Sequence, residues 1–234
     1  MYTCKDIFSP VNIVKQIAMF TKLIYVSLKD KSCSKSFDLY SVWNKKEVLL
    51  LGDSTVCGTN LKDYSDSLAH KFFEKGYNTT KIGKPMYKIT DLVKLIDRKK
   101  YLLIDRKYDL TCIFIGANDL MIPCTNFTVV EKKLNNLFNL ITKYKSNLGN
   151  ILFMSKGDNT GMGALVYPYN YILQKKIDKF DNLAQKVCYR HNITFFELSN
   201  KLSYCANNCR TDDGLHLNGN GFDIVASEIL KYYN

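Results

Sequence analysis

The sequence contains no internal repeat, no low-complexity segment and no linker rich in proline and glycine. These absences argue against a repeat architecture and against several domains joined by flexible segments. Apolar residues make up 46% of the 234 residues, so the chain can bury a sizeable core and does not have the composition of a disordered protein. We expect one domain over residues 46–234. Residues 1–45 are expected to form an N-terminal extension with one helix packed on that domain.

A long uninterrupted apolar run is also missing. The best candidate, residues 11–28, is broken by Lys15 and Lys22, so it fits neither a transmembrane helix nor the apolar region of a signal peptide. The Asn-x-Ser/Thr sequons at Asn78, Asn126 and Asn192 are no more than chance supplies in a chain this rich in asparagine. The sequence leaves the compartment undetermined and favours an intracellular protein without a transmembrane segment.

No long basic tract accompanies the net charge of +11. The densest runs are short and scattered: Lys45-Lys46, Arg98-Lys99-Lys100 and Lys175-Lys176. A charge of this size reports on solubility and non-specific binding more than on a particular function. We interpret it as solvated surface and expect no specific nucleic-acid partner. A basic binding module without catalysis is the alternative of a different class.

Most of the eight cysteines lie in apolar or strand-like runs and are interpreted as buried thiols. Cys205 and Cys209 instead lie in a polar loop. A zinc ion there would need further ligands, and only His216 is close in sequence. A local disulfide or two free thiols are favoured over a metal site, and we expect neither a metal nor another cofactor.

Strand-like and helix-like patterns alternate along the domain. Short strand-like runs, most of them apolar, predict strands at residues 47–52, 77–82, 110–115, 150–154 and 193–198. Apolar residues at three- and four-residue spacings predict helices at residues 61–76, 89–100, 129–144, 171–190 and 221–233. This alternation predicts an α/β fold, a three-layer α/β/α arrangement with a five-stranded, doubly wound parallel sheet.

Two predicted strands run into polar segments, and ligands bind at the carboxyl ends of parallel strands. The first strand is followed by Gly52-Asp53-Ser54. Ser54 at such a turn fits a nucleophile, but Asp or Ser there is equally typical of a helix N-cap. The third strand is followed by Gly116-Ala117-Asn118-Asp119. The Asn118 amide could donate a hydrogen bond to an oxyanion, or it could serve a turn.

Near the end of the chain, Asp213 and His216 lie three residues apart, before the last predicted helix. A carboxylate at this spacing can hold one imidazole nitrogen and stabilise the imidazolium that forms when histidine accepts a proton. Only two other histidines exist, His70 and His191, and both are interpreted as structural or surface residues. Cys57, close to Ser54, is interpreted as a packing residue, with a reactive thiol as the lesser alternative.

These three segments, in this order, resemble the motifs of the SGNH (GDSL-type) hydrolase superfamily, over roughly residues 47–234. The resemblance implies a flavodoxin-like SGNH hydrolase fold and an esterase mechanism. Ser54 would attack an acyl carbonyl and form an acyl-enzyme, His216 would act as base and then acid, and Asp213 would orient His216. The substrate would be a small ester or an acylated carbohydrate or lipid, with a short acyl or acetyl group. Acyl transfer to another acceptor would use the same residues.

The resemblance also implies an oxyanion hole with three donors. These are the Ser54 backbone N–H, a backbone N–H from the loop after the second strand, and the Asn118 side chain. Gly83 is the natural candidate for the middle donor, and an alternative alignment puts Met86 in its place. The glycine-containing loop over residues 156–171 would suit a substrate-facing lid, with plain surface loop as the alternative.

Overall fold

The computed structural model describes residues 45–121, 124–156, 168–198 and 208–233, with residues 39–40, residue 202 and a few positions between 10 and 21. Most of the N-terminal extension, residues 157–167 of the predicted lid and Cys205 lie outside the described residues. The described positions between 10 and 21 are helical, and the packing of that helix on the domain stays a prediction.

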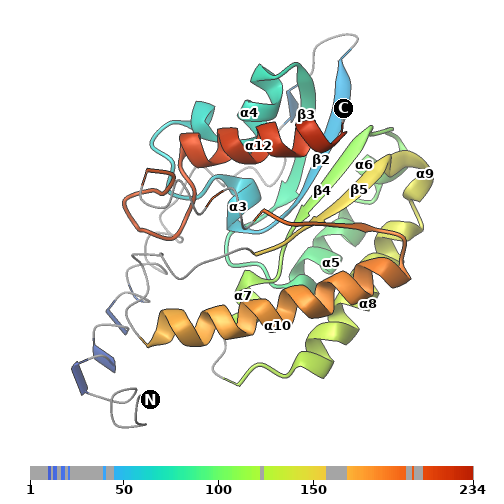
Figure 1. Ribbon diagram of the computed structural model, residues 1–234. Helices are drawn as coiled ribbons and strands as arrows, with labels where there is room; N and C mark the ends of the chain where they lie inside the picture. Colours follow the sequence, from blue (N-terminus) through green and yellow to red (C-terminus); the bar gives the residue numbers. More distant parts are fainter. Residues whose placement is uncertain are drawn as a thin grey trace.

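A single sheet organises the described chain (Figure 1). Its strands lie in the order β1-β3-β2-β4-β5-β6, and the last five of these are parallel to one another. Their bounds are β2 (Lys46–Gly52), β3 (Tyr77–Gly83), β4 (Leu110–Phe114), β5 (Asn150–Met154) and β6 (Thr194–Phe196). This confirms the predicted five-stranded parallel sheet. A two-residue strand that we did not predict, β1 (Leu39–Tyr40), adds to β3 in antiparallel orientation.

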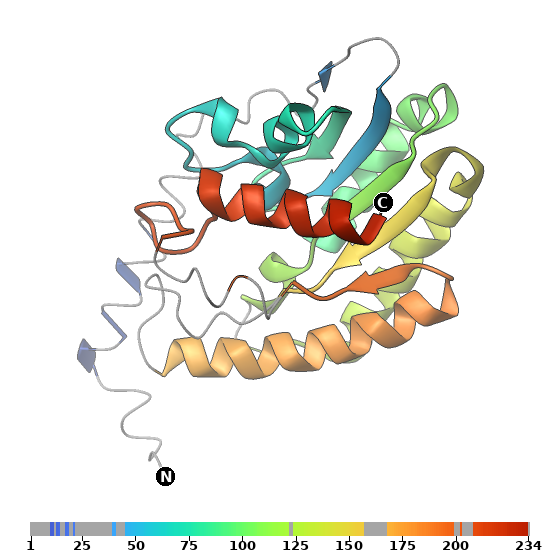
Figure 2. The ribbon, with the colours of Figure 1, turned by 45° about the horizontal axis from the view of Figure 1, so that its top comes forward.

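Helices cover both faces of the sheet (Figures 1 and 2). The short helix α3 (Ser54–Cys57), α4 (Leu68–Glu74) and α12 (Gly219–Tyr233) lie on one face. On the other lie α5 (Ile89–Arg98), α8 (Phe127–Thr142) and α10 (Tyr169–Arg190). Shorter helices are η2 (Tyr64–Asp66), α6 (Tyr101–Ile104), α7 (Ala117–Leu120) and α9 (Lys145–Leu148). None of the helices in the described part of the chain is long and apolar enough to cross a membrane.

One predicted helix, residues 61–76, is wrong in its first turns. Ser67 has extended backbone angles and separates η2 from α4, and its hydroxyl caps α4 by accepting a hydrogen bond from the His70 N–H. An extended residue with a capping hydroxyl begins a new helix, which apolar spacing does not register. The other long helices lie within a few residues of their predicted bounds.

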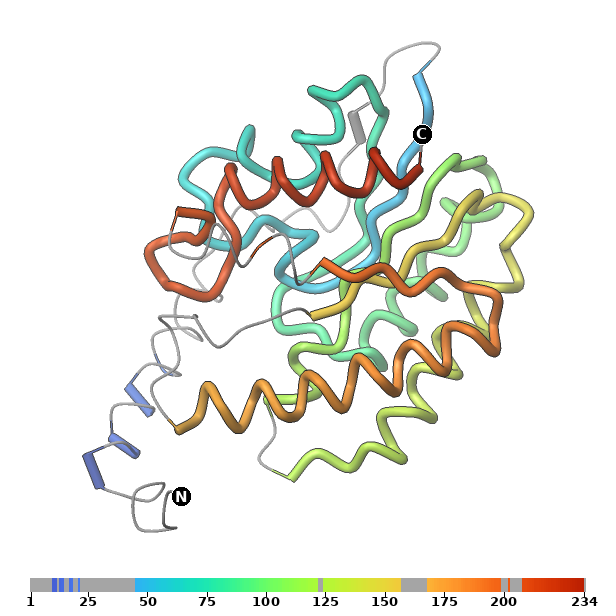
Figure 3. The backbone as a smooth tube through the Cα atoms, viewed as in Figure 1, coloured from blue at the N-terminus to red at the C-terminus, as the bar shows by residue number. Residues whose placement is uncertain are grey.

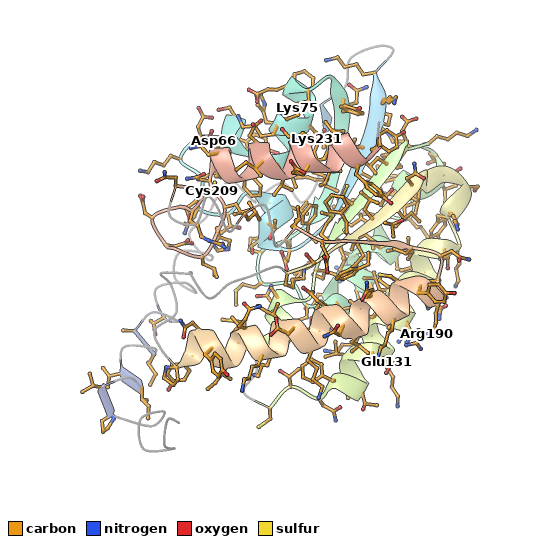
Figure 4. The ribbon with its side chains drawn as sticks, in the orientation of Figure 1. Asp66, Lys75, Glu131, Arg190, Cys209 and Lys231 are labelled. Carbon is orange, nitrogen blue, oxygen red and sulfur yellow. The ribbon has the colours of Figure 1, made fainter. Side chains whose placement is uncertain are left out.

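The central strands β2, β4 and β5 bury both of their faces, which explains why they are mostly apolar. In β2, Leu49 and Leu51 face the core under α5, α8 and α10, whereas Val48 and Leu50 face the core under α3, α4 and α12. Ion pairs on the surface join helices within each layer. Arg190 of α10 contacts Glu131 of α8 at 2.5 Å, and Lys75 after α4 contacts Asp223 of α12 at 2.7 Å (Figure 4).

The order of the strands brings distant segments of the chain together. The chain leaves β2 in one direction to form β3 and later returns on the other side of β2 to form β4 (Figure 3). The carboxyl ends of β3, β2 and β4 are therefore neighbours, at the point where ligands bind in doubly wound sheets. At this point Gly52 pairs with Gly83 on one side and with Phe114 on the other.

Candidate active site

Ser54 is the first residue of α3, directly after β2 (Figure 1). The preceding residue, Asp53, is the N-cap of this helix, because its carboxylate accepts a hydrogen bond from the Thr55 N–H at 3.1 Å. Asp53 also donates its own N–H to the carbonyl of Phe114, at 3.1 Å. The capping role that the sequence left open between Asp53 and Ser54 therefore belongs to Asp53. The hydroxyl of the half-buried Ser54 is not required for it.

The end of β2 lies unusually close to its neighbours. A Cβ atom on Gly52 would lie 2.2 Å from the Phe114 carbonyl oxygen, and one on Gly83 would lie 2.5 Å from the Gly52 carbonyl oxygen. Both distances are far inside van der Waals contact, so any side chain would push the strands apart. These two glycines let the three strand ends approach one another beside Ser54.

Asp213 and His216 form a direct pair in the loop before α12. The His216 Nδ1 atom lies 2.6 Å from Asp213 Oδ2, and the two side chains are 11% and 3% exposed. Asp213 Oδ1 accepts three further hydrogen bonds, from the Thr211 hydroxyl at 2.7 Å and the N–H groups of Leu215 and His216 at 2.8 and 3.0 Å. Because a carboxylate only accepts, the proton is on Nδ1, and Nε2 is left as the basic nitrogen.

The surroundings of Asp213 favour its ionised form. Burial acts to raise the pKa of this carboxyl, but the hydrogen bonds and charge of His216, together with the Thr211 hydroxyl, outweigh it and hold the pKa well below its ordinary value of 3.8. Asp213 is therefore a carboxylate at neutral pH, able to stabilise a positive charge on the His216 ring.

Asn118 lies in α7, which follows β4. Gly116 begins this helix at a φ of 118°, and a Cβ atom there would meet the Phe180 ring at 2.4 Å. The Asn118 amide donates a hydrogen bond to the Tyr87 carbonyl at 2.9 Å, which joins this helix to the loop after β3. The amide group has two N–H donors, so one is left for another acceptor.

The neighbouring Asp119 strengthens the same connection. It is buried, accepts a hydrogen bond from the Ile89 N–H at 2.9 Å and forms an ion pair with Lys133 at 2.7 Å. Its carboxylate thus holds together the starts of α5 and α7 and the helix α8. The two loops predicted to supply oxyanion donors are fixed to each other by these contacts.

The two candidates for the middle oxyanion donor differ in their environment. Gly83 is the last residue of β3 and is buried against β2. Met86 lies in the loop that follows, with its side chain 51% exposed and a φ of 63°, in the left-handed region that non-glycine residues rarely adopt.

The turn that carries Ser54 contains a buried carboxyl group, that of Asp53. Asp53 is 2% exposed, and burial raises its pKa against the opposing effects of Lys156, Thr55 and His216. Burial likewise lowers the pKa of Lys156, opposed first by Asp53 and then by Asp181 and Asp119. Both oxygens of Asp181 accept the Lys156 backbone N–H, at 3.1 Å. A positive charge on His216 would also lower the pKa of Asp53, the residue next to Ser54.

The other two histidines and two of the cysteines lie in the following surroundings. His70 contacts Glu74 within α4, and His191 contacts Asn135 Oδ1 at 3.0 Å and the Phe138 ring. Both therefore have structural contacts away from Asp213. Cys57 is a buried thiol in α3. Cys209 is disulfide-bonded, with a partner outside the described residues.

Three residues of the site were missed by the sequence analysis: Asn60, Thr211 and Lys156. Asn60 donates a hydrogen bond from its amide to Asp213 Oδ2, across 153 positions of the chain. The left-handed conformation of Asn60 has a sequence signal, since asparagine tolerates that conformation better than most residues, but its partner has none. Thr211, two residues before Asp213, could have been proposed from its spacing.

A sequence model of the family described as GDSL-like Lipase/Acylhydrolase matches residues 48–229. No curated protein sequence matches the chain. Solved structures with a similar fold include a member of the lipolytic protein G-D-S-L family from Veillonella parvula, with a TM-score of 0.60 and 15% identity over 80% of this chain and 97% of the other. TesA gives a TM-score of 0.59 with the same identity and coverage. Est24, a carbohydrate acetylesterase from Sinorhizobium meliloti, gives 0.56 and 15% identity over 80% and 100%.

The family model spans all three motifs, from the strand before Ser54 to the helix after His216. The similar structures share the flavodoxin-like SGNH fold that the motifs implied. The resemblance predicted from the sequence is confirmed: this chain belongs to the GDSL-like lipase/acylhydrolase family and is an ester hydrolase of the SGNH type.

Proposed function

We propose that the protein is a serine esterase that hydrolyses esters of short acyl groups through an acyl-enzyme on Ser54. The Ser54 hydroxyl attacks the ester carbonyl, and its proton passes to His216 Nε2. The tetrahedral intermediate then expels the alcohol, which takes that proton from His216. Water attacks the acyl-enzyme by the same route, and the acid is released.

The Asp213–His216 pair is the observation that carries this proposal. The 2.6 Å contact at Nδ1 holds the ring in the tautomer whose Nε2 is basic, and a low pKa keeps the Asp213 partner charged. A histidine that served only as a surface residue would not need an almost fully buried carboxylate partner that accepts this many hydrogen bonds. The same arrangement is what a general base in acyl transfer requires.

The oxyanion that forms on the carbonyl needs hydrogen-bond donors, and removal of one such donor typically costs about 10²–10³ in turnover. We assign the Ser54 backbone N–H, the second N–H of the Asn118 amide and a backbone N–H in the loop after β3. Gly83 and Met86 are the candidates for the last donor. The position of Met86 outside the strand, and its left-handed conformation, support Met86, because Gly83 is packed within the sheet.

A short acyl group is the substrate class that we propose. The esterases of similar fold include a carbohydrate acetylesterase from Sinorhizobium meliloti and an acetylxylan esterase from Geobacillus stearothermophilus. We therefore expect acetylated carbohydrates among the substrates, and a fall in kcat/KM from acetyl to octanoyl esters of the same alcohol.

The test measures hydrolysis of p-nitrophenyl acetate, butyrate and octanoate, and labelling by a fluorophosphonate probe. Ser54→Ala and His216→Ala should each lower kcat by about 10⁴-fold or more, and Ser54→Ala should abolish labelling. Ser146→Ala, an exposed serine in α9, and His70→Gln, a histidine in α4, are matched controls that should retain activity. Folded protein that neither turns over these esters nor is labelled at Ser54 would contradict the proposal.

A further inference from the structure

The segment that follows the nucleophile helix is held rigidly to it. Gly58 ends α3 in the left-handed conformation, and its N–H donates to the carbonyls of Ser54 and Thr55. The N–H of Thr59 donates to the Ser54 carbonyl at 3.2 Å. Asn60 comes next and is also left-handed, with a φ of 69°. The position of Asn60 is therefore set by the same backbone that positions Ser54.

Asn60 reaches across to the other half of the site. Its Nδ2 donates a hydrogen bond to Asp213 Oδ2, the oxygen that also accepts from His216 Nδ1. The donors to Oδ1, from Thr211, Leu215 and His216, all come from the loop that carries Asp213 itself. Asn60 thus supplies the donor to this carboxylate that comes from the nucleophile segment.

From this contact we infer that Asn60 is a positioning residue for the reaction. It aligns the Asp213–His216 pair with the helix that begins at Ser54. Its hydrogen bond also stabilises part of the negative charge on Asp213 Oδ2, the oxygen that contacts His216 Nδ1. This inference rests on the proposed function, because it concerns the same nucleophile and base. Asn60 touches neither substrate nor the reacting atoms in this role; it acts through Asp213.

The hydrogen bond from Asn60 to Asp213 predicts an effect on the pH profile that a purely structural role of Asn60 would not produce. Without the Asn60 amide, Asp213 Oδ2 has one donor fewer and carries more negative charge toward His216. That charge favours the protonated ring, so the acid limb of the kcat/KM profile should move to higher pH. A residue that served only to stabilise the fold would lower the melting temperature and leave the position of this limb unchanged.

A matched control lies two residues further along the chain. Lys62 forms an ion pair of 3.1 Å with Asp212, so it also joins the nucleophile segment to the histidine loop. The two side chains are 84% and 87% exposed, and a solvated ion pair of this kind contributes little to stability. Lys62→Gln therefore breaks a connection between the same two segments without touching Asp213.

The experiment compares Asn60→Gly, Lys62→Gln and the unmodified protein by kcat, KM and the pH profile with p-nitrophenyl acetate. Glycine accepts the left-handed conformation of residue 60, so the backbone should be preserved. We expect Asn60→Gly to lower kcat by about 10- to 100-fold with little change in KM, and to move the acid limb upward. Lys62→Gln should match the unmodified protein in all three.

A second comparison keeps the test decisive if Asn60→Gly is poorly folded. Asn60→Ser retains a small polar residue that is too short to reach Asp213, and it should give the same shift of the acid limb. In addition, the effect of Asn60→Gly on the rate of fluorophosphonate labelling should vanish in the Asp213→Asn background, because the shared carboxylate is gone.

The outcomes separate the two proposals. If the unmodified protein is active and both Asn60 variants keep its acid limb and kcat, the positioning role is overturned and the proposed function stands. If the unmodified protein neither hydrolyses esters nor is labelled at Ser54, the proposed function itself fails, and the role of Asn60 in it fails as well.

Discussion

Two buried carboxyl groups flank the proposed reaction centre, and their surroundings move their pKa values in opposite directions. Asp53, in the turn before α3, has its pKa raised because burial dominates over Lys156 and the Thr55 N–H. Asp213, in the histidine loop, has its pKa lowered because several hydrogen bonds and the charge of His216 outweigh burial. The comparison teaches that burial alone does not decide the charge of a carboxyl group; the donors directed at it do.

The difference also separates their roles. Asp53 uses its carboxylate to cap α3, so its contact shapes the turn that carries Ser54. In the proposed mechanism, Asp213 uses its carboxylate to orient His216 as a base and to stabilise the charge that this base acquires. A neutral isostere can do the first job and cannot do the second.

Replacing each carboxylate by its amide should affect the reaction rate very differently at the two positions. Asp213→Asn should lower kcat by about 10⁴-fold, because an amide no longer enforces the tautomer of His216. Asp53→Asn should change kcat by less than about 10-fold, since asparagine is an equally good N-cap. Ester hydrolysis by the two purified variants checks this prediction, and similar losses in both would refute the separation of roles.

Asp53 and Asp213 should also contribute to the free energy of unfolding with opposite dependence on pH. Because the pKa of Asp213 is lower in the folded than in the unfolded state, this residue stabilises the protein at pH values above its unfolded-state pKa. That stabilisation is lost as the pH falls below about 5. A raised pKa means that Asp53 contributes most below its unfolded value of 3.8 and loses that contribution as the pH rises through its folded pKa.

Urea unfolding from pH 3 to pH 8 measures both contributions. The free energy of unfolding of the unmodified protein, minus that of Asp213→Asn, should grow as the pH rises from 3. The same difference for Asp53→Asn should shrink over that range. Trends of the same sign in the two variants would show that the two carboxyl groups have similar environments.

The smallest effect concerns the turns beside the two regions. The histidine loop makes its left-handed turn with Gly214, at a φ of 67°, whereas the loop after β3 uses Met86, at a φ of 63°. Met86→Gly should raise the free energy of unfolding by about 1 kcal/mol, because glycine bears no Cβ penalty there. Thermal unfolding of Met86→Gly, with Met121→Gly in a right-handed position as a destabilised control, tests this expectation.

Much of the site could be predicted because it depends on local sequence. Short apolar runs specify buried strands, and the polar segments after them must emerge at one edge of a parallel sheet. The spacing of three between Asp213 and His216 was enough to predict their contact. The predicted helix over residues 61–76 failed at Ser67, where a local cap interrupts a pattern of apolar residues that otherwise continues.

The class of the fold, the succession of strands and helices along the chain, and the three motifs could all be predicted from the sequence. The folded structure was needed to see that Asp53 rather than Ser54 caps the helix, and that Asp213 Oδ2 accepts from both Asn60 and His216. The physical reason is distance along the chain. Propensities and apolar spacing act over a few residues, whereas a hydrogen bond across 153 positions exists only after the sheet has brought both segments to the same edge.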